Sequence, residues 1–256
     1  MKKEKILLIA GCSHTAGSEI DGNEDSSYNR EHSYGGIIAK ELGKRAINIA
    51  QPGATNAGIA RQVMFWFNEN YYPETMDVNV LVGWSETTRM EIPSETMRNY
   101  QTSCTKADWY DQSAESYFKV IIGWNGHGEE EKLAIPLLHR FMVENQGYLQ
   151  VSTHNTILQL QYFLQANNID YLFNNTMPLY CQNLNKKEHA VKNLTRLVDK
   201  TKYYKMNNGN QAFYIKYKNM GYTNDKAKYW HHAEEPHRLY AEDLLEFNEI
   251  NKCLKK

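Results

Sequence analysis

A short apolar run near the start of the chain ends abruptly in small residues. Residues 6–10 read Ile-Leu-Leu-Ile-Ala, and Gly11, Cys12 and Ser13 follow at once. A run of this length that stops at glycine predicts a buried strand, and parallel sheets are built from such strands. Open parallel sheets bind ligands at the carboxyl ends of their strands, so Ser13 is expected at that edge. A serine there is either part of an ordinary β-to-α turn or a nucleophile.

Strands and amphipathic helices alternate along the first 85 residues, which favours parallel strands joined by right-handed crossovers. The second half continues the alternation with one more strand and several helices. The predicted strands are 6–10, 46–50, 78–82 and 169–173, and the predicted helices are 34–43, 57–68, 133–145, 152–167, 185–200 and one after Pro236. We therefore expect one α/β domain over residues 1–256, with a central parallel sheet between two layers of helices.

Three segments depart from this rhythm. Residues 18–31 are polar and predict an exposed loop. Residues 92–131 mix aromatic and polar side chains without a helical period, and we expect an aromatic-rich insertion or lid after the third strand. Residues 202–222 combine tyrosine with lysine, a pattern that nucleic-acid surfaces also show.

Charge and cysteine content narrow the classes of partner. The chain has 29 Lys and Arg against 30 Asp and Glu, which argues against a broad nucleic-acid or anionic-membrane surface. The cysteines form no CxxC pair and the histidines show no metal-ligand spacing, so we expect no metal, no cofactor and no disulfide framework. The apolar run before Cys12 is too short for a lipoprotein signal, and we expect a cytoplasmic protein without a membrane anchor. The oligomeric state is left open.

Several loops are expected to meet at one edge of the sheet. Ser13, Gly53 and Ser85 each follow a predicted strand, and a histidine-rich segment, 231–237, precedes the last helix. Acyl transfer by a serine needs a base in hydrogen-bond reach and donors aimed at the developing oxyanion. The loops supply both kinds of group. No Gly-x-Ser-x-Gly elbow surrounds Ser13, which argues against an α/β-hydrolase.

These segments resemble the blocks of the SGNH (GDSL-like) hydrolases, which are flavodoxin-like α/β esterases. The first block resembles residues 11–17, Gly-Cys-Ser-His-Thr-Ala-Gly, and the second resembles 48–55, Asn-Ile-Ala-Gln-Pro-Gly-Ala-Thr. The third resembles 83–86, Gly-Trp-Ser-Glu, and the last resembles 231–237, which begins and ends in histidine. The amino-acid sequences of the first and third blocks resemble in particular those of divergent family members carried by bacteriophages.

The resemblance implies roles for individual residues. Ser13 would be the nucleophile and His231 its general base, and the backbone amides of Ser13 and Gly53 would form the oxyanion hole. Ser85 stands where the family has an asparagine donor, a role that Asn56 of the neighbouring loop would share. Lys228 stands where the family has the aspartate that orients the imidazole, and Asp225 is the nearest acid upstream.

Other assignments stay open beside these. His232 replaces His231 as base if the loop is shifted by one residue, and His14 is adjacent to Ser13. Arg89 and His14 are candidates for binding a polar or anionic group of the substrate, and Cys12 is an alternative nucleophile. His237 is expected to be structural.

Two functions follow. The first is a serine esterase or deacetylase that cleaves a small-molecule or carbohydrate ester through an acyl-enzyme, with transfer to another acceptor not excluded. The alternative is a catalytically silent SGNH fold that serves as a binding or interaction module, for example a phage accessory protein.

Overall fold

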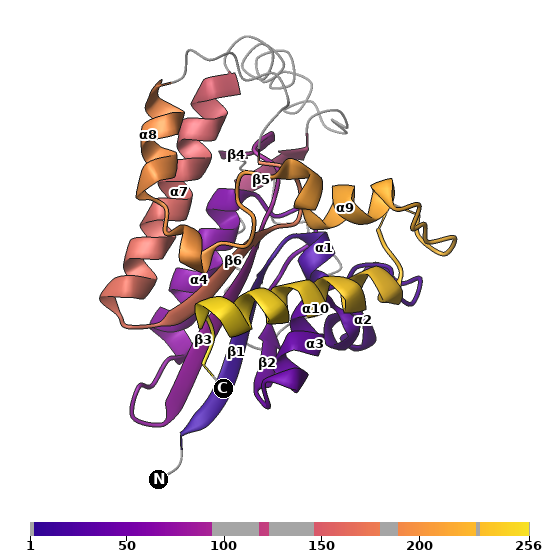
Figure 1. Ribbon diagram of the computed structural model, residues 1–256, viewed down its shortest axis with the longest axis horizontal. Coiled ribbons are helices and arrows are strands. Elements are labelled where there is room, and N and C mark those ends of the chain that lie inside the picture. The colour runs from indigo at the N-terminus through magenta and orange to yellow at the C-terminus, as the bar shows by residue number, and fades with distance from the viewer. Residues whose placement is uncertain (1–2, 94–117, 123–145, 180–188, 229–230, 256) are drawn as a thin grey trace.

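A computed structural model describes residues 3–93, 118–122, 146–179, 189–228 and 231–255 (Figure 1). The predicted helix over 133–145 and most of the predicted insertion, 92–131, lie outside these ranges. Within them, no helix has both the length and the apolar character that crossing a bilayer requires.

The central sheet has four described strands, all parallel. They are β1 (Glu4–Gly11), β2 (Arg45–Asn48), β3 (Met76–Trp84) and β6 (Asp170–Asn175), in the order β2-β1-β3-β6. This order, with the first strand between the second and the third, is that of flavodoxin-like doubly wound sheets. The predicted parallel sheet is confirmed, with strand ends displaced by a few residues.

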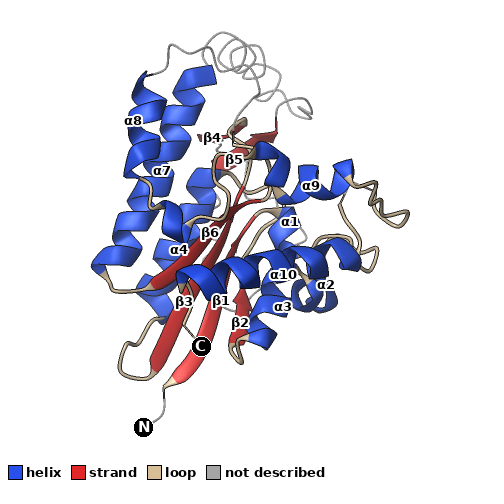
Figure 2. Cartoon of the chain, viewed as in Figure 1, coloured by secondary structure: helices blue, strands red, loops and turns tan. Residues whose placement is uncertain are grey.

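Helices cover both faces of the sheet, so the predicted three layers are confirmed (Figures 1 and 2). Along β1, Ile6 and Leu8 face a core shared with α4 (Asn56–Asn70) and α7 (Gln146–Ala166). Leu7 and Ile9 face the opposite core, with α3 (Tyr34–Glu41) and α10 (Glu234–Asn251). All four side chains are fully buried, because alternate residues of a strand point to opposite faces. Helix α8 (His189–Leu197) packs on α7.

The predicted exposed loop over 18–31 is wrong in two ways. It contains a helix, α2 (Ser27–His32), which begins where the Ser26 side chain accepts a hydrogen bond from the Asn29 backbone N–H. It also turns inward, because Asn29 is fully buried and Glu19 is 2% exposed. Composition alone missed this segment, since several of its buried residues are polar: Asn29 is held by local hydrogen bonds and Glu19 by contacts with the C-terminal loop.

Residues 202–222 also contain structure that periodicity did not reveal. Helix α9 (Phe213–Asn219) buries Phe213 and Tyr217, one turn apart, and short 3₁₀ turns lie at Lys200–Lys202 and Gly209–Gln211. After the third strand, β4 (Arg89–Pro93) and β5 (Phe118–Ile122) pair antiparallel as a separate ribbon. Of the predicted insertion, 92–131, the structure describes residues 92–93 at the end of β4 and all of β5.

Candidate active site

The loops that carry Ser13, Gly53 and Ser85 meet at the carboxyl edge of the sheet. β1 and β3 end level with each other, because Gly11 pairs with Gly83. The loop after β2 reaches the same point, where the Gln51 N–H donates to the Gly11 carbonyl at 2.9 Å. The expected convergence of these loops is confirmed.

The turn after β1 holds Ser13 at the start of a single helical turn, α1 (Ser13–Ala16). Gly11 is required there, because a Cβ on it would lie 2.5 Å from the Thr15 Cβ and 2.9 Å from the Gly83 carbonyl oxygen. Cys12 is fully buried, with its Sγ 3.3 Å from Thr176 Oγ1. Its thiol therefore points into the protein, away from any substrate, and the alternative nucleophile is removed.

The C-terminal histidine segment folds over this turn. The imidazole rings of His14 and His231 lie edge to face, with centroids 5.0 Å apart. His14 follows Ser13 directly, so this contact brings His231 to the edge of the sheet that carries the turn of the predicted nucleophile. Among the described residues, no hydrogen bond joins the Ser13 hydroxyl to the His231 imidazole.

A buried carboxylate holds His231. Glu19 Oε2 lies 2.6 Å from His231 Nδ1, and both side chains are nearly inaccessible, at 3% and 10% exposure. The other carboxylate oxygen accepts the backbone N–H of Lys228 at 2.8 Å, and the Glu19 carbonyl accepts from Asn224 Nδ2 at 3.0 Å. Glu19 has a φ of 65°, in the left-handed region that side chains other than glycine rarely adopt. Its backbone is therefore strained to deliver the carboxylate to the C-terminal loop.

This contact fixes the tautomer of His231. An ionised carboxylate only accepts hydrogen bonds, so the proton is on Nδ1 and Nε2 is left with a free lone pair. Burial lowers the pKa of His231 below its usual value, while the hydrogen bond and the charge of Glu19 oppose that shift. The imidazole is consequently neutral at neutral pH, which a general base must be.

The carboxylate on His231 is therefore not the expected one. Asp225 is exposed, whereas Glu19 comes from the loop that follows the nucleophile. Lys228, at the position of the family's aspartate, donates its backbone N–H to Glu19. The signal that could have revealed Glu19 is Ile20, an apolar residue inside a polar stretch, which is 7% exposed and anchors the segment inward.

The neighbouring histidines have other partners. His232 Nε2 lies 3.1 Å from the Tyr214 carbonyl, which can only accept, so this nitrogen carries a proton and is engaged. His237 Nδ1 accepts the backbone N–H of Tyr34 at 3.2 Å and is 1% exposed, in keeping with a structural role. Burial, followed by the charge of His231, lowers the pKa of His14 well below its usual value. His14 is thus a neutral, buried ring packed on His231 and Tyr214.

Asn56 and Ser85 form one unit at the third loop. Asn56 Oδ1 accepts the Ser85 backbone N–H at 2.8 Å, and its Nδ2 donates to the Ser85 carbonyl at 3.0 Å. The amide of Asn56 is therefore occupied by the backbone of Ser85. The Ser85 hydroxyl is fully buried and has no hydrogen-bond partner. A buried donor without an acceptor is uncommon and is found at functional sites.

Arg89 lies between the second and third loops. Its Nε is 3.1 Å from Glu86 Oε1, and its Nη1 donates to the Ala54 carbonyl at 3.3 Å. The side chain is 8% exposed, and its charge lowers the pKa of both His14 and His231. Arg89 therefore joins the two loops on the same edge as the histidines.

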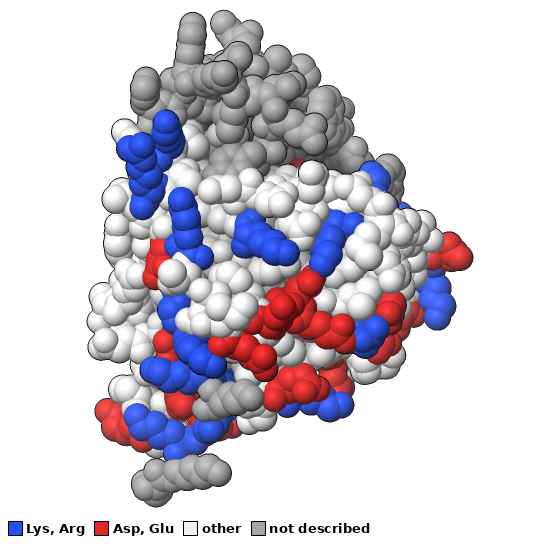
Figure 3. Space-filling model, in the orientation of Figure 1, with Lys and Arg blue, Asp and Glu red and all other residues white. Residues whose placement is uncertain are grey.

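Charge on the surface is mixed. On the face that carries α10, basic and acidic side chains lie close to one another (Figure 3). Among the residues with described positions, no three His, Cys, Asp or Glu side chains are grouped so that they could hold a metal ion.

Comparisons with known proteins give likenesses of fold only. No family model and no curated protein sequence matches the chain. A psychrotrophic esterase, EstA, from Pseudoalteromonas sp. is 13% identical, with 96% of this chain and 97% of that chain covered and a TM-score of 0.45. A lipolytic protein of the G-D-S-L family from Veillonella parvula is 10% identical, with 94% and 97% covered and a TM-score of 0.46.

A carbohydrate esterase family 2 enzyme with a carbohydrate-binding domain, from Corynascus thermopiles (Myceliophthora fergusii), is 12% identical. The alignment covers 98% of this chain and 67% of the esterase chain, with a TM-score of 0.49. With TM-scores below 0.5, these likenesses decide nothing about the chemistry of this chain, which rests on its own side-chain contacts.

Proposed function

We propose that this chain is an SGNH-type serine hydrolase that cleaves an ester of a small molecule or sugar, such as an O-acetyl group, through an acyl-enzyme. The observation that carries the proposal is the Glu19–His231 pair, whose imidazole packs against His14, the residue that follows Ser13. A carboxylate, an imidazole and a hydroxyl in this arrangement are the parts that serine acyl transfer needs. Transfer of the acyl group to an acceptor other than water uses the same parts.

The reaction follows from the assigned protons. Ser13 Oγ attacks the ester carbonyl carbon while His231 Nε2 takes the hydroxyl proton, and Glu19 stabilises the resulting imidazolium. The carbonyl oxygen becomes an oxyanion, which the backbone N–H groups of Ser13 and Gly53 receive. The imidazolium then gives its proton to the departing alcohol. Water then attacks the acyl carbon while His231 takes its proton. The bond from the acyl carbon to Ser13 Oγ breaks, His231 returns the proton to Oγ, and the carboxylic acid leaves.

Ser85 and Asn56 complete the oxyanion hole in this proposal. The Ser85 hydroxyl has a proton that no other residue accepts, and it supplies the additional donor. Asn56 holds the Ser85 backbone in place through its own amide. Arg89 and His14 form the wall against which the rest of the substrate lies.

A fluorophosphonate probe tests the proposal, because it labels an activated serine covalently. We expect the wild-type protein to be labelled and the Ser13→Ala and His231→Gln variants to remain unlabelled. Ser27→Ala is the matched control, since Ser27 is an exposed serine in the segment that follows the Ser13 turn. Labelling that persists in Ser13→Ala contradicts the assignment.

The alternative function, a silent binding module, is favoured by one observation. The family's third-block asparagine is Ser85 here, and the nearby Asn56 amide is already occupied. Loss of one oxyanion donor costs about 10²–10³ in rate. Absence of labelling in a protein shown by circular dichroism to be folded would favour this alternative.

Source and location are part of the proposal and rest on sequence alone. The amino-acid sequence of residues 11–17 and 83–89 supports the assignment of this chain to a bacteriophage-type group within the SGNH hydrolases. The absence of CxxC pairs supports a reducing, cytoplasmic location. Fractionation of cells that produce the full chain tests the location.

A further inference from the structure

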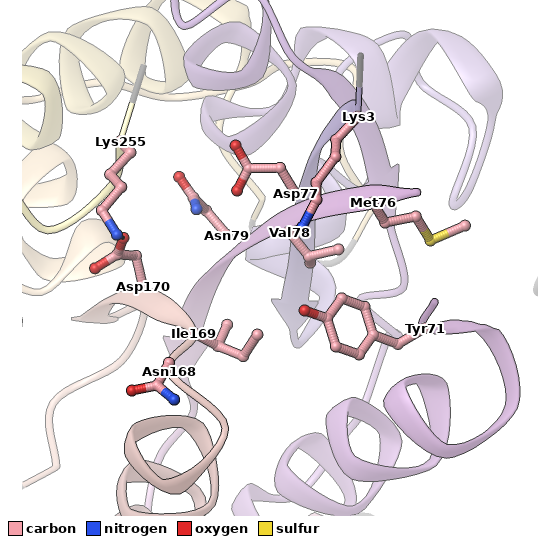
Figure 4. A pocket seen from close by; sticks show the side chains of 10 residues that line it. All are labelled: Lys3, Tyr71, Met76, Asp77, Val78, Asn79, Asn168, Ile169, Asp170 and Lys255. Carbon is pink, nitrogen blue, oxygen red and sulfur yellow. Dashed lines mark ion pairs between the residues drawn. The ribbon is translucent and has the colours of Figure 1, made fainter. Parts of the chain in front are cut away.

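A second pocket lies at the opposite edge of the sheet from Ser13. It opens at the amino ends of β3 and β6, near both ends of the described chain, and has a volume of about 350 Å³ (Figures 1 and 4). Binding sites for small molecules start at about this size. Its lining residues are Lys3, Tyr71, Met76, Asp77, Val78, Asn79, Asn168, Ile169, Asp170 and Lys255.

Two hydrogen-bond acceptors that line this pocket receive no hydrogen bond from the residues that the structure describes. Asn79 is 1% exposed, and its Oδ1 has no hydrogen-bond partner. The carboxylate of Asp77, two residues earlier on β3, forms no hydrogen bond or ion pair with the residues that the structure describes. By contrast, Asp170 is paired with Lys255 at 2.7 Å and with Lys202 at 3.5 Å. A buried amide oxygen without a partner is costly, so a ligand donor at this place stabilises the protein.

The charges of the lining argue for a neutral ligand. Lys3 and Lys255 balance Asp77 and Asp170. Lys44, a buried lysine whose Nζ has no hydrogen-bond partner, lies close enough to Asp77 for that carboxylate to raise its pKa against the effect of burial. A phosphate would face Asp77, and an organic amine would face this group of lysines. Neither charge sign is therefore favoured.

The polar and apolar parts of the lining also define the ligand. Tyr71 places its ring in the pocket, with Val78 and Ile169 beside it (Figure 4). Asp77 and Asn79 Oδ1 only accept hydrogen bonds, and Lys3 only donates. Sugar hydroxyls donate and accept at once, and a sugar ring has apolar C–H faces. We propose that this pocket binds one pyranose ring of a carbohydrate, at a site separate from the serine centre.

Saturation-transfer NMR on the full chain tests the site. The probes are methyl β-D-glucopyranoside, methyl β-D-xylopyranoside and N-acetylglucosamine, with inorganic phosphate and adenosine as comparison ligands. We expect saturation transfer to at least one sugar and not to adenosine, and no displacement of that sugar by phosphate. Absence of transfer to all three sugars, a preference for adenosine, or displacement by phosphate overturns the proposal.

Variants locate the bound sugar. Asp77→Ala is expected to weaken its binding about tenfold, the effect of one hydrogen bond to a charged group. Tyr71→Ala is expected to weaken it as well. The matched controls are Glu74→Ala and Tyr72→Ala, which change exposed residues outside the lining and should leave binding unchanged.

Ser13→Ala separates this site from the proposed active site. We expect it to leave sugar binding intact, whereas loss of binding in Ser13→Ala would place the sugar at the serine edge and overturn the proposal. Equal binding by Asp77→Ala and Glu74→Ala also overturns it. Fluorophosphonate labelling is read independently, so failure of one proposal does not resemble failure of the other.

Discussion

The Nδ1 atom of His231 lies 2.6 Å from the Oε2 atom of Glu19, although the two residues are 212 positions apart in the chain. Both side chains are buried, and the second oxygen of Glu19 is satisfied by the Lys228 backbone. The imidazole is thereby held in one tautomer and one orientation next to the turn that carries Ser13. In the proposed mechanism, this geometry makes Glu19 the residue that positions His231.

Glu19→Gln should abolish most of the activity without unfolding the protein. The amide keeps the size of the side chain but no longer requires the proton on Nδ1, and loss of the correct tautomer costs a serine protease about 10⁴ in kcat. The measurement is p-nitrophenyl acetate hydrolysis, with KM expected to change little. Asp225→Asn is the matched control, because Asp225 is exposed. If Asp225→Asn lost activity and Glu19→Gln kept it, our assignment of the acid would be wrong.

The pH profile of kcat/KM should show an acid limb below pH 6.5. Burial lowers the pKa of His231, so the active neutral imidazole persists to a lower pH than that of an ordinary histidine. In Glu19→Gln the residual activity should have its limb at still lower pH, because the carboxylate is the group that raises this pKa. An inflection above pH 6.5 in the wild-type protein would contradict the burial argument.

Ser85→Ala and Asn56→Ala should separate catalysis from stability. The Ser85 hydroxyl has no partner to lose, so its removal should leave the free energy of unfolding unchanged and lower kcat about 10²–10³-fold. Asn56→Ala strips the Ser85 backbone N–H of its acceptor, which costs about 1–3 kcal/mol in the free energy of unfolding. Urea unfolding and ester hydrolysis measure the two effects. Unchanged kcat in Ser85→Ala would remove Ser85 from the oxyanion hole.

Acid should destabilise the fold before carboxylates titrate. Burial is the largest cause that lowers the pKa of His14, His231, His232 and His237. The unfolded chain therefore binds more protons below about pH 6.5, and the free energy of unfolding falls as pH drops through that value toward the folded pKa values. Urea midpoints at pH 7.5 and pH 5.5 and equal ionic strength test this. His14→Phe, which keeps a ring, should reduce the difference.

Hydrophobic pattern predicted the scaffold because strands buried on both faces leave unmistakable apolar runs. Residues 6–10 and 78–82 lie in β1 and β3, and the predicted helix 34–43 is α3, capped by the Ser33 side chain, which accepts a hydrogen bond from the Gly36 N–H. Because the strands are parallel, their carboxyl ends lie at the same edge of the sheet. The loops of Ser13, Gly53 and Ser85 could therefore be predicted to lie at one edge without information on any side-chain contact.

The missed parts depend on long-range polar contacts, which leave no periodic signal. Glu19 reads as one acid in a polar stretch, and only the folded C-terminal loop gives its carboxylate a partner. Asp225 is the nearest acid upstream of His231 in the sequence, yet distance along the chain says little about which carboxylate a buried imidazole will contact. The occupied amide of Asn56 is likewise set by a loop 29 residues away.

The 212-residue separation of Glu19 and His231 also determines when the site can form during synthesis. A ribosome that has made the nucleophile and its acid must still complete every strand of the described sheet before the base emerges. In the proposed hydrolase, the Ser13 hydroxyl therefore has no base while the chain is being made, and the pair that would activate it forms only after residue 231 has been added.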